Sequence, residues 1–250
     1  MNAAIRVEAL KLVRSPVGLI GTLALVAGTL ALLGGITVAL ADGNPELTAK
    51  AGAAATLDWN GLLASAAQIT AAGGLLGFGV VLSWMFGREF TDGTITGLFA
   101  LPVSRSRIAL AKLTVYTAWS IAVSVVLTLG ILALGLLLGY GTPTADDWGG
   151  LARHGALTMF TAAIAVPVAW IASVTRSMLA SVGGAIALVI IAQVGALAGA
   201  GGWMPLAAPA LWAMSSGTAV TPVQLALAIV VGIVFAALTC AAWARLQLNR

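Results

Sequence analysis

Charge is what this chain of 250 residues lacks most: Asp, Glu, Lys and Arg make up 8% of it, against 60% hydrophobic residues. So little polar material cannot cover the surface of a water-soluble globule, which predicts a membrane protein. The single cysteine, Cys240, excludes an intramolecular disulfide and a metal site of paired thiolates. The net charge of +4 is explained by anchoring at a membrane surface and requires no nucleic acid as a partner.

Side chains that could carry chemistry are equally scarce. The only histidine, His154, stands beside Arg153 at the edge of an apolar run, so we expect it at a surface and not in a metal site. No set of acids recurs at helical spacing, and the phosphate-binding pattern G-x-x-x-x-G-K-[ST] does not occur. The sequence therefore predicts no catalytic residue, no metal ligand and no cofactor on this chain, and it excludes ATP binding by that loop.

Long apolar runs fill most of the sequence. A helix needs about 20 such residues to cross the hydrocarbon core of a membrane. Six runs reach that length, at about 17–41, 61–86, 113–140, 155–174, 177–200 and 223–244. They leave no stretch for a soluble domain, so we predict a single all-α transmembrane domain over residues 1–250. The first run is too long for the apolar part of a signal peptide and is interpreted as a retained span.

Basic residues are distributed unequally between the two sides that these spans define. If both termini are cytoplasmic, ten Lys and Arg residues lie inside, and only Lys50 and Arg153 lie outside. Cytoplasmic segments of membrane proteins carry the excess of positive charge. We therefore predict a multi-pass protein of the cytoplasmic membrane, in contact with lipid, with both termini inside. The ten inner residues are Arg6, Lys11, Arg14, Arg88, Arg105, Arg107, Lys112, Arg176, Arg245 and Arg250.

Two further segments differ from plain spans and short loops. Residues 1–16 place apolar residues on one helical face and Glu8, Lys11 and Arg14 towards the other, which predicts an amphipathic helix on the inner membrane surface. Residues 201–222, before the last span, are apolar but interrupted by prolines and glycines. Such backbone is tolerated at membrane depth only where protein or water shields it, which predicts a broken, re-entrant segment on the outer side.

The loop at 87–107, between the second and third spans, gathers charge in an otherwise apolar chain. Within it, Ile95, Leu98 and Phe99 form an apolar stripe at helical spacing, and Pro102 requires the helix to end. Topology alone explains the basic residues of the loop, but it does not explain this order. The pattern predicts a short cytoplasmic helix with an exposed apolar stripe, which is typical of a contact site.

This loop resembles the cytoplasmic loop of type-2 ABC exporter permeases. Its stretch GREFTDGTITGLFALPVSRSRIALAKL contains the elements common in that loop, namely R-E, G-T, a short apolar stretch, P-V-S-R and a Lys near the next span. The layout of the N-terminal helix, the six spans and the broken outer segment is also similar to that family. The resemblance thus covers the whole chain in layout, and its sequence-specific part is confined to about 25 residues around the loop.

The resemblance implies that the loop forms a coupling helix, which in that family docks in a groove of a separate ATP-hydrolysing subunit. It also implies a second permease subunit, here in a homodimer, and two ATPase copies that bind ATP and Mg²⁺. This chain would then be the transport subunit and not an enzyme. The residues at the implied docking positions are Arg88, Glu89, Gly93, Thr94, Ile95, Leu98, Phe99, Pro102 and Arg105.

The polar residues at the centres of the spans are Gln68, Thr70 and Gln193, which either bond one helix to another or line a substrate path. An apolar path without fixed charge suits a hydrophobic or amphiphilic substrate, such as a drug, an antimicrobial peptide or a lipid-like compound. An ion-coupled secondary carrier is the main alternative. Such carriers bury charged residues within their spans, and the centres of these six spans have none. A non-transporting membrane scaffold is the third reading.

Overall fold

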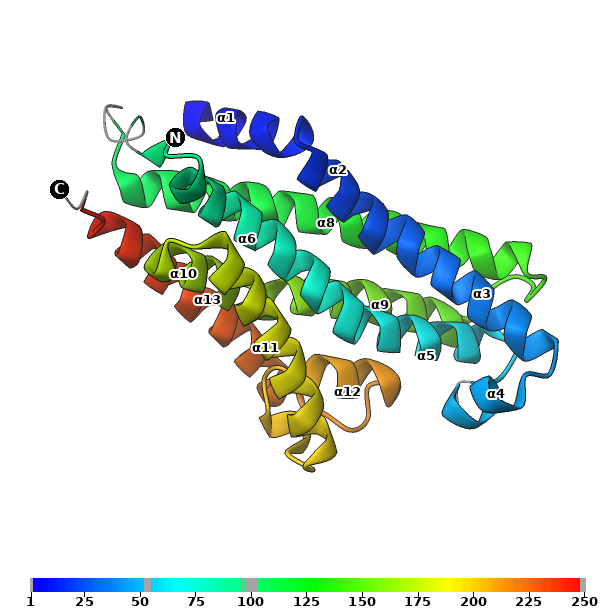
Figure 1. Cartoon of the computed structure of the whole chain (residues 1–250). Coiled ribbons are helices and arrows are strands. Elements are labelled where there is room, and N and C mark those ends of the chain that lie inside the picture. The colour runs from blue at the N-terminus through cyan, green and yellow to red at the C-terminus, as the bar shows by residue number, and fades with distance from the viewer. Residues whose placement is uncertain (1, 52–54, 96, 98–102, 248–250) are drawn as a thin grey trace.

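The computed structural model describes residues 2–51, 55–95, 97 and 103–247, which form helices joined by turns (Figure 1). Within these ranges, six helices are long and apolar enough to cross a membrane. The all-helical fold and the number of candidate spans are therefore confirmed. The spans are Pro16–Ala41, Trp59–Thr91, Arg105–Leu137, Ala145–Thr175, Met178–Leu197 and Pro222–Ala244.

Three of the six spans are interrupted helices. The first joins α2 (Pro16–Leu23) to α3 (Thr29–Ala41), and the second joins α5 (Trp59–Ile69) to α6 (Leu75–Thr91), in each case through one π-helical turn. The fourth consists of α9 (Ala145–Ile164) and α10 (Pro167–Thr175). The third, fifth and sixth are the single helices α8 (Arg105–Leu137), α11 (Met178–Leu197) and α13 (Pro222–Ala244).

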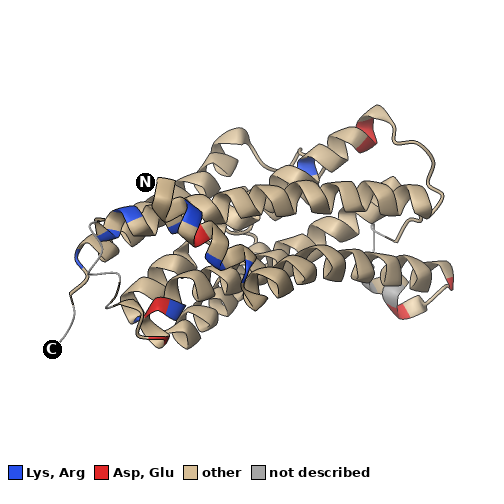
Figure 2. Cartoon of the chain, turned by 90° about the horizontal axis from the view of Figure 1, so that it is seen from above, with Lys and Arg blue, Asp and Glu red and all other residues tan. Residues whose placement is uncertain are grey.

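The two ends of the bundle differ in charge. Both chain termini, the end of α6 and the start of α8 lie together at one end (Figure 1), and most of the Lys and Arg residues gather there (Figure 2). The short helices α4 (Pro45–Ala51) and α12 (Ala208–Met214) lie at the other. We call the first the basic end and the second the far end. The broken segment predicted before the last span forms a 3₁₀ turn, Gly201–Trp203, and α12.

An elbow separates the N-terminal helix α1 (Asn2–Val13) from the first span. Ser15 caps α2 by accepting a 2.8 Å hydrogen bond from the Gly18 amide, and Pro16 occupies the first helical position, where no amide donor is needed. The predicted helix and its break are confirmed. The predicted polar face was wrong for Glu8, which is 5% exposed because α1 packs along α8.

Several helices extend beyond the predicted span limits. The second span continues to Thr91 and the third begins at Arg105, so both charged flanks of the predicted loop are helical. The fourth begins ten residues before the predicted Gly155, where Thr144 and Asp147 form a capping box. A hydropathy pattern ends a span where charged residues begin, whereas the helix itself continues through those residues.

Pro167 interrupts the fourth span towards its C-terminal end, because proline has no amide hydrogen and its ring crowds the preceding turn. Just before it, the Val166 amide bonds the Ala163 carbonyl oxygen at 3.1 Å, three residues back and not four. The carbonyl of Ala162 instead accepts a 2.8 Å bond from the Tyr116 hydroxyl of α8. A neighbouring helix thus satisfies the backbone group that the break leaves over.

The core lies around α6, whose Phe78 and Leu82 are fully buried and which packs against α2, α10 and α11. A second, smaller cluster lies towards the far end, where Trp59 and Leu62 of α5 meet Ile131 of α8. Ile108 and Leu113, near the start of α8, belong to the main core, so packing fixes both ends of this helix.

Candidate coupling site and substrate groove

Four charged side chains from three helices form a buried ion network at the basic end. Lys112 of α8 bonds Glu8 of α1 at 2.7 Å and Glu89 of α6 at 2.8 Å between Nζ and carboxylate oxygens. Lys11 of α1 bonds the same two carboxylates, at 2.9 Å each. The network joins residues that are up to 104 positions apart in the sequence. We call it the ion network.

Burial makes the ion network consequential. The side chains of Lys112 and Glu89 are 1% and 2% exposed, and that of Lys11 is 29% exposed. Two positive and two negative charges balance, so none of the buried charges is left without a partner. Burial lowers the pKa of Lys11, but hydrogen bonds and attraction from Glu8 and Glu89 outweigh it and hold this pKa above 10.5. Lys11 therefore stays charged at physiological pH.

The loop after α6 is attached directly to this network. Thr94 donates a 2.6 Å hydrogen bond from its hydroxyl to Oε2 of Glu89, and Ile95 packs against the main core. Gly93 has φ of +67°, a left-handed conformation that costs glycine little and lets the chain turn away from α6. On the outer side of the same turn, Arg88 lies 4.7 Å from the centroid of the Trp84 ring.

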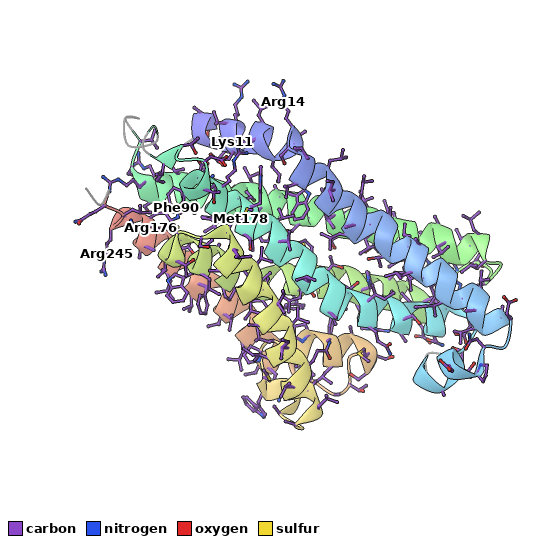
Figure 3. All side chains as sticks on the ribbon, in the orientation of Figure 1. Lys11, Arg14, Phe90, Arg176, Met178 and Arg245 are labelled. Carbon is purple, nitrogen blue, oxygen red and sulfur yellow. The ribbon has the colours of Figure 1, made fainter. Side chains whose placement is uncertain are left out.

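The C-terminal end of α13 closes the basic end. Trp243 is 1% exposed, packs edge-on against Phe86 and Phe90 of α6, and donates a 2.8 Å bond to the Ser173 hydroxyl. Two arginines hold the residues that follow α13. Arg105, at the start of α8, donates a hydrogen bond to the carbonyl oxygen of Leu246, and Arg176, just after α10, donates one to the carbonyl oxygen of Gln247 at 3.2 Å. Figure 3 shows Phe90, Arg176 and Arg245 together at this end.

The docking positions implied by the sequence are distributed over this site. Arg88 and Glu89 lie in the last turns of α6, Gly93 to Ile95 follow it, and Arg105 begins α8. Glu89 is buried in the ion network, so its side chain supports the loop from inside and is not presented at the surface. The remaining positions, Leu98, Phe99 and Pro102, lie outside the described residues.

Sequence reasoning missed the partners of Glu89. Lys112 was read as one of ten charges that set topology, and Glu8 as part of a polar face, yet both are buried. One signal was available: Lys112 stands within the apolar stretch IALAKLTVY, where a lysine requires an acidic partner. The identity of that partner depends on tertiary packing and could not be read.

At the far end, Gln68 and Gln193 line one pocket of about 640 Å³. Its other walls are apolar and come from α11 and the α12 region, including Leu206, Leu211 and Met214. Two glutamines that are 125 positions apart thus share one concave surface, which is the candidate site for a substrate and which we call the substrate groove. Thr70, grouped with them in the sequence, is 2% exposed and does not line it.

His154 was predicted at a surface, and this was wrong. It is 2% exposed, and its Nε2 lies 3.0 Å from the Thr70 hydroxyl oxygen, across α9 and the π-helical turn of the second span. The cause is the early start of α9, which places residue 154 on the inner face of a helix. Thr70 and His154 therefore bond one helix to another. Among the described residues, no group of three His, Cys, Asp or Glu could hold a metal ion.

Comparison with known proteins identifies a family. The family model described as "ABC-2 family transporter protein" matches residues 4–194 of the 250. The matched part begins in α1 and ends in α11, so it contains the whole ion network and the loop. No curated protein matches the chain.

Proposed function

Because the chain belongs to the ABC-2 family of transporter proteins, it is the membrane permease of an ABC-2 type transporter, and we propose that it works as an exporter. It acts as a homodimer together with two copies of a separate ATPase subunit, which bind ATP and Mg²⁺. Family membership decides against the ion-coupled carrier and the non-transporting scaffold. The substrate crosses the cytoplasmic membrane, and both termini of this chain face the cytoplasm.

The observation that carries the coupling role is the ion network. Lys112 ties α1, α6 and the start of α8 together through Glu8 and Glu89, and Glu89 also holds Thr94 of the loop. A force applied to the loop by an ATPase therefore acts on three helices as one body, because buried charge-assisted hydrogen bonds resist separation. In this arrangement the loop receives the motion and the network distributes it.

The substrate groove supports a hydrophobic or amphiphilic substrate, such as a drug, an antimicrobial peptide or a lipid-like compound. Its walls are mostly apolar, and Gln68 and Gln193 provide amide groups that bond a polar part of the substrate without adding charge. The α12 region covers the groove at the far end and serves as the re-entrant outer segment of the transport path. Thr70 supports this path from behind through its bond to His154.

Orientation can be tested with single cysteines in a Cys240→Ala background. We expect Thr48→Cys, on exposed α4 at the far end, to react with an impermeant thiol reagent in intact cells. Ser104→Cys, which is exposed at the basic end, should react only after the membrane is permeabilised. Labelling of Ser104→Cys but not of Thr48→Cys in intact cells would reverse the proposed topology.

Docking is tested by Leu98→Asp, which lies in the predicted apolar stripe of the loop. If this stripe enters a groove of the ATPase, a carboxylate there is buried without a partner, and association should weaken by about a hundredfold or more. The measurement is recovery of tagged ATPase with purified permease, together with transport in vesicles. Normal ATPase recovery and normal transport would contradict docking through this stripe.

The matched control is Arg107→Gln, at an exposed position two residues into α8. It removes one of ten basic residues from the same region, and we expect topology, ATPase recovery and transport to remain close to those of the wild type. A loss as large as that of Leu98→Asp would show that charge in this region, and not the apolar stripe, governs association.

A further inference from the structure

A pocket of about 600 Å³ lies at the elbow between α1 and α2, beside the last turns of α6. The face of α1 that lines it carries Val7, Leu10, Lys11 and Arg14, which recur at helical spacing, and α6 contributes Trp84 and Arg88. Because the first span begins at Pro16, the pocket stands at the level of a membrane surface. That position is the same whichever side the basic end faces. We call it the elbow pocket.

Three basic residues line the elbow pocket, and one of their charges is left over. Glu8 and Glu89 balance Lys11 and Lys112 in the ion network, and Asp92 lies 3.6 Å from Arg88. Arg14 is exposed and makes no ion pair or side-chain hydrogen bond with the described residues. Figure 3 shows it pointing away from the bundle. The local charge is therefore one positive unit, carried by a guanidinium with free donors.

Two exposed apolar side chains and one partly buried tryptophan stand next to this charge. Val7 and Leu10 are 50% and 52% exposed, and Trp84 presents its ring beneath the Arg88 guanidinium. Exposed apolar side chains beside cations at the start of a membrane span complement the two parts of a phospholipid, its charged headgroup and its acyl chains. The guanidinium groups match a phosphate, and the apolar residues match the first carbons of an acyl chain.

We infer that the elbow pocket binds one phospholipid with a single negative charge, such as phosphatidylglycerol. Its phosphate bonds Arg14 and Arg88, and an acyl chain lies against Leu10 and Trp84. The single unbalanced charge favours a monoanionic headgroup over a zwitterionic one, in which an ammonium group would meet Arg14. The bound lipid fixes α1 against α6 at the membrane surface, next to the ion network. This inference stands independently of the transport activity.

The test is lipid binding to the purified full chain in detergent, counted by native mass spectrometry. Phosphatidylglycerol and phosphatidylcholine with identical acyl chains are titrated separately. We expect phosphatidylglycerol to bind about tenfold more tightly, and Arg14→Gln to remove most of that difference. Arg14→Lys should restore part of it. Thermal unfolding of each variant checks the fold, which a change at an exposed position should preserve.

The matched control is again Arg107→Gln, which removes an exposed charge from the same end but outside the pocket. Unchanged selectivity in Arg107→Gln together with lost selectivity in Arg14→Gln supports the site. Equal losses of selectivity in both variants would show that the lipid is attracted to the basic end in general and not to this pocket. Unchanged selectivity in a folded Arg14→Gln would overturn it. Displacement of the lipid by millimolar glycerol 3-phosphate would identify a site for soluble phosphates instead.

Discussion

Replacing Lys112 by Met should destabilise the folded chain by about 3 to 5 kcal/mol, among the largest effects that one substitution can have here. The lysine is 1% exposed and bonds two carboxylates. Without it, Glu8 and Glu89 share only Lys11, and one negative charge stays buried without a partner. The measurement is unfolding of purified protein by SDS in mixed micelles, followed by circular dichroism.

Lys11→Met provides the contrast, because Lys11 bonds the same two carboxylates but is 29% exposed. Water can replace it, so we expect a loss below about 2 kcal/mol. Adding Glu8→Gln to Lys112→Met removes the excess negative charge and should recover part of the stability. Equal losses for Lys112→Met and Lys11→Met would show that burial does not control this network.

Trp243→Ala should cost a further large amount, about 3 to 5 kcal/mol, and should loosen the basic end. The side chain is 1% exposed and fills the space between Phe86 and Phe90 of α6. Its removal leaves a cavity that two aromatic rings cannot close without shifting. The same SDS titration measures the loss, and limited proteolysis near the C-terminus reports the loosening.

Two substitutions separate packing from hydrogen bonding. Trp243→Phe keeps an aromatic ring but loses the bond to the Ser173 hydroxyl, which still donates to the Ala169 carbonyl; we expect a cost of about 1 to 2 kcal/mol. Trp203→Ala, at a position 68% exposed, should change stability by less than about 0.5 kcal/mol. A cost for Trp203→Ala equal to that for Trp243→Ala would contradict the proposed role of burial.

The spans could be predicted because a run of about 20 apolar residues is a local property of the chain. The pairing of Gln68 with Gln193 in one groove was only half predicted. Their polarity within spans marked them, but only tertiary packing, with α11 against the second span, brings them together. The wrong expectation for His154 has a local cause. Hydropathy placed the start of the fourth span at Gly155, whereas the capping box starts it at Ala145.

The ion network could not be predicted, because its partners come from three helices and an elbow sets the position of α1. The sequence of residues 1–16 does not indicate that Glu8 faces the bundle, because Glu8, Lys11 and Arg14 alone predict the polar face of an amphipathic helix. Lys11 bonds Glu8 locally, but the fully buried cation that helps to offset the cost of burying Glu8 is Lys112, which is 104 positions away. Long-range compensation of this kind leaves no periodic signal in one sequence.

The break at Pro167 has a mechanical consequence for the whole molecule. The Ala162 carbonyl that it leaves over is held by Tyr116, which stands one helical turn beyond Lys112 on α8. The third span is thus hydrogen-bonded to the fourth span close to the point where the ion network holds the third span. An axial displacement of α8 must either drag α9 along or break this hydroxyl bond and the 2.9 Å bond from the Ser124 hydroxyl to the Gly155 carbonyl oxygen. A displacement of α8 that begins at the ion network is therefore passed to the fourth span within about 6 Å along the axis of α8.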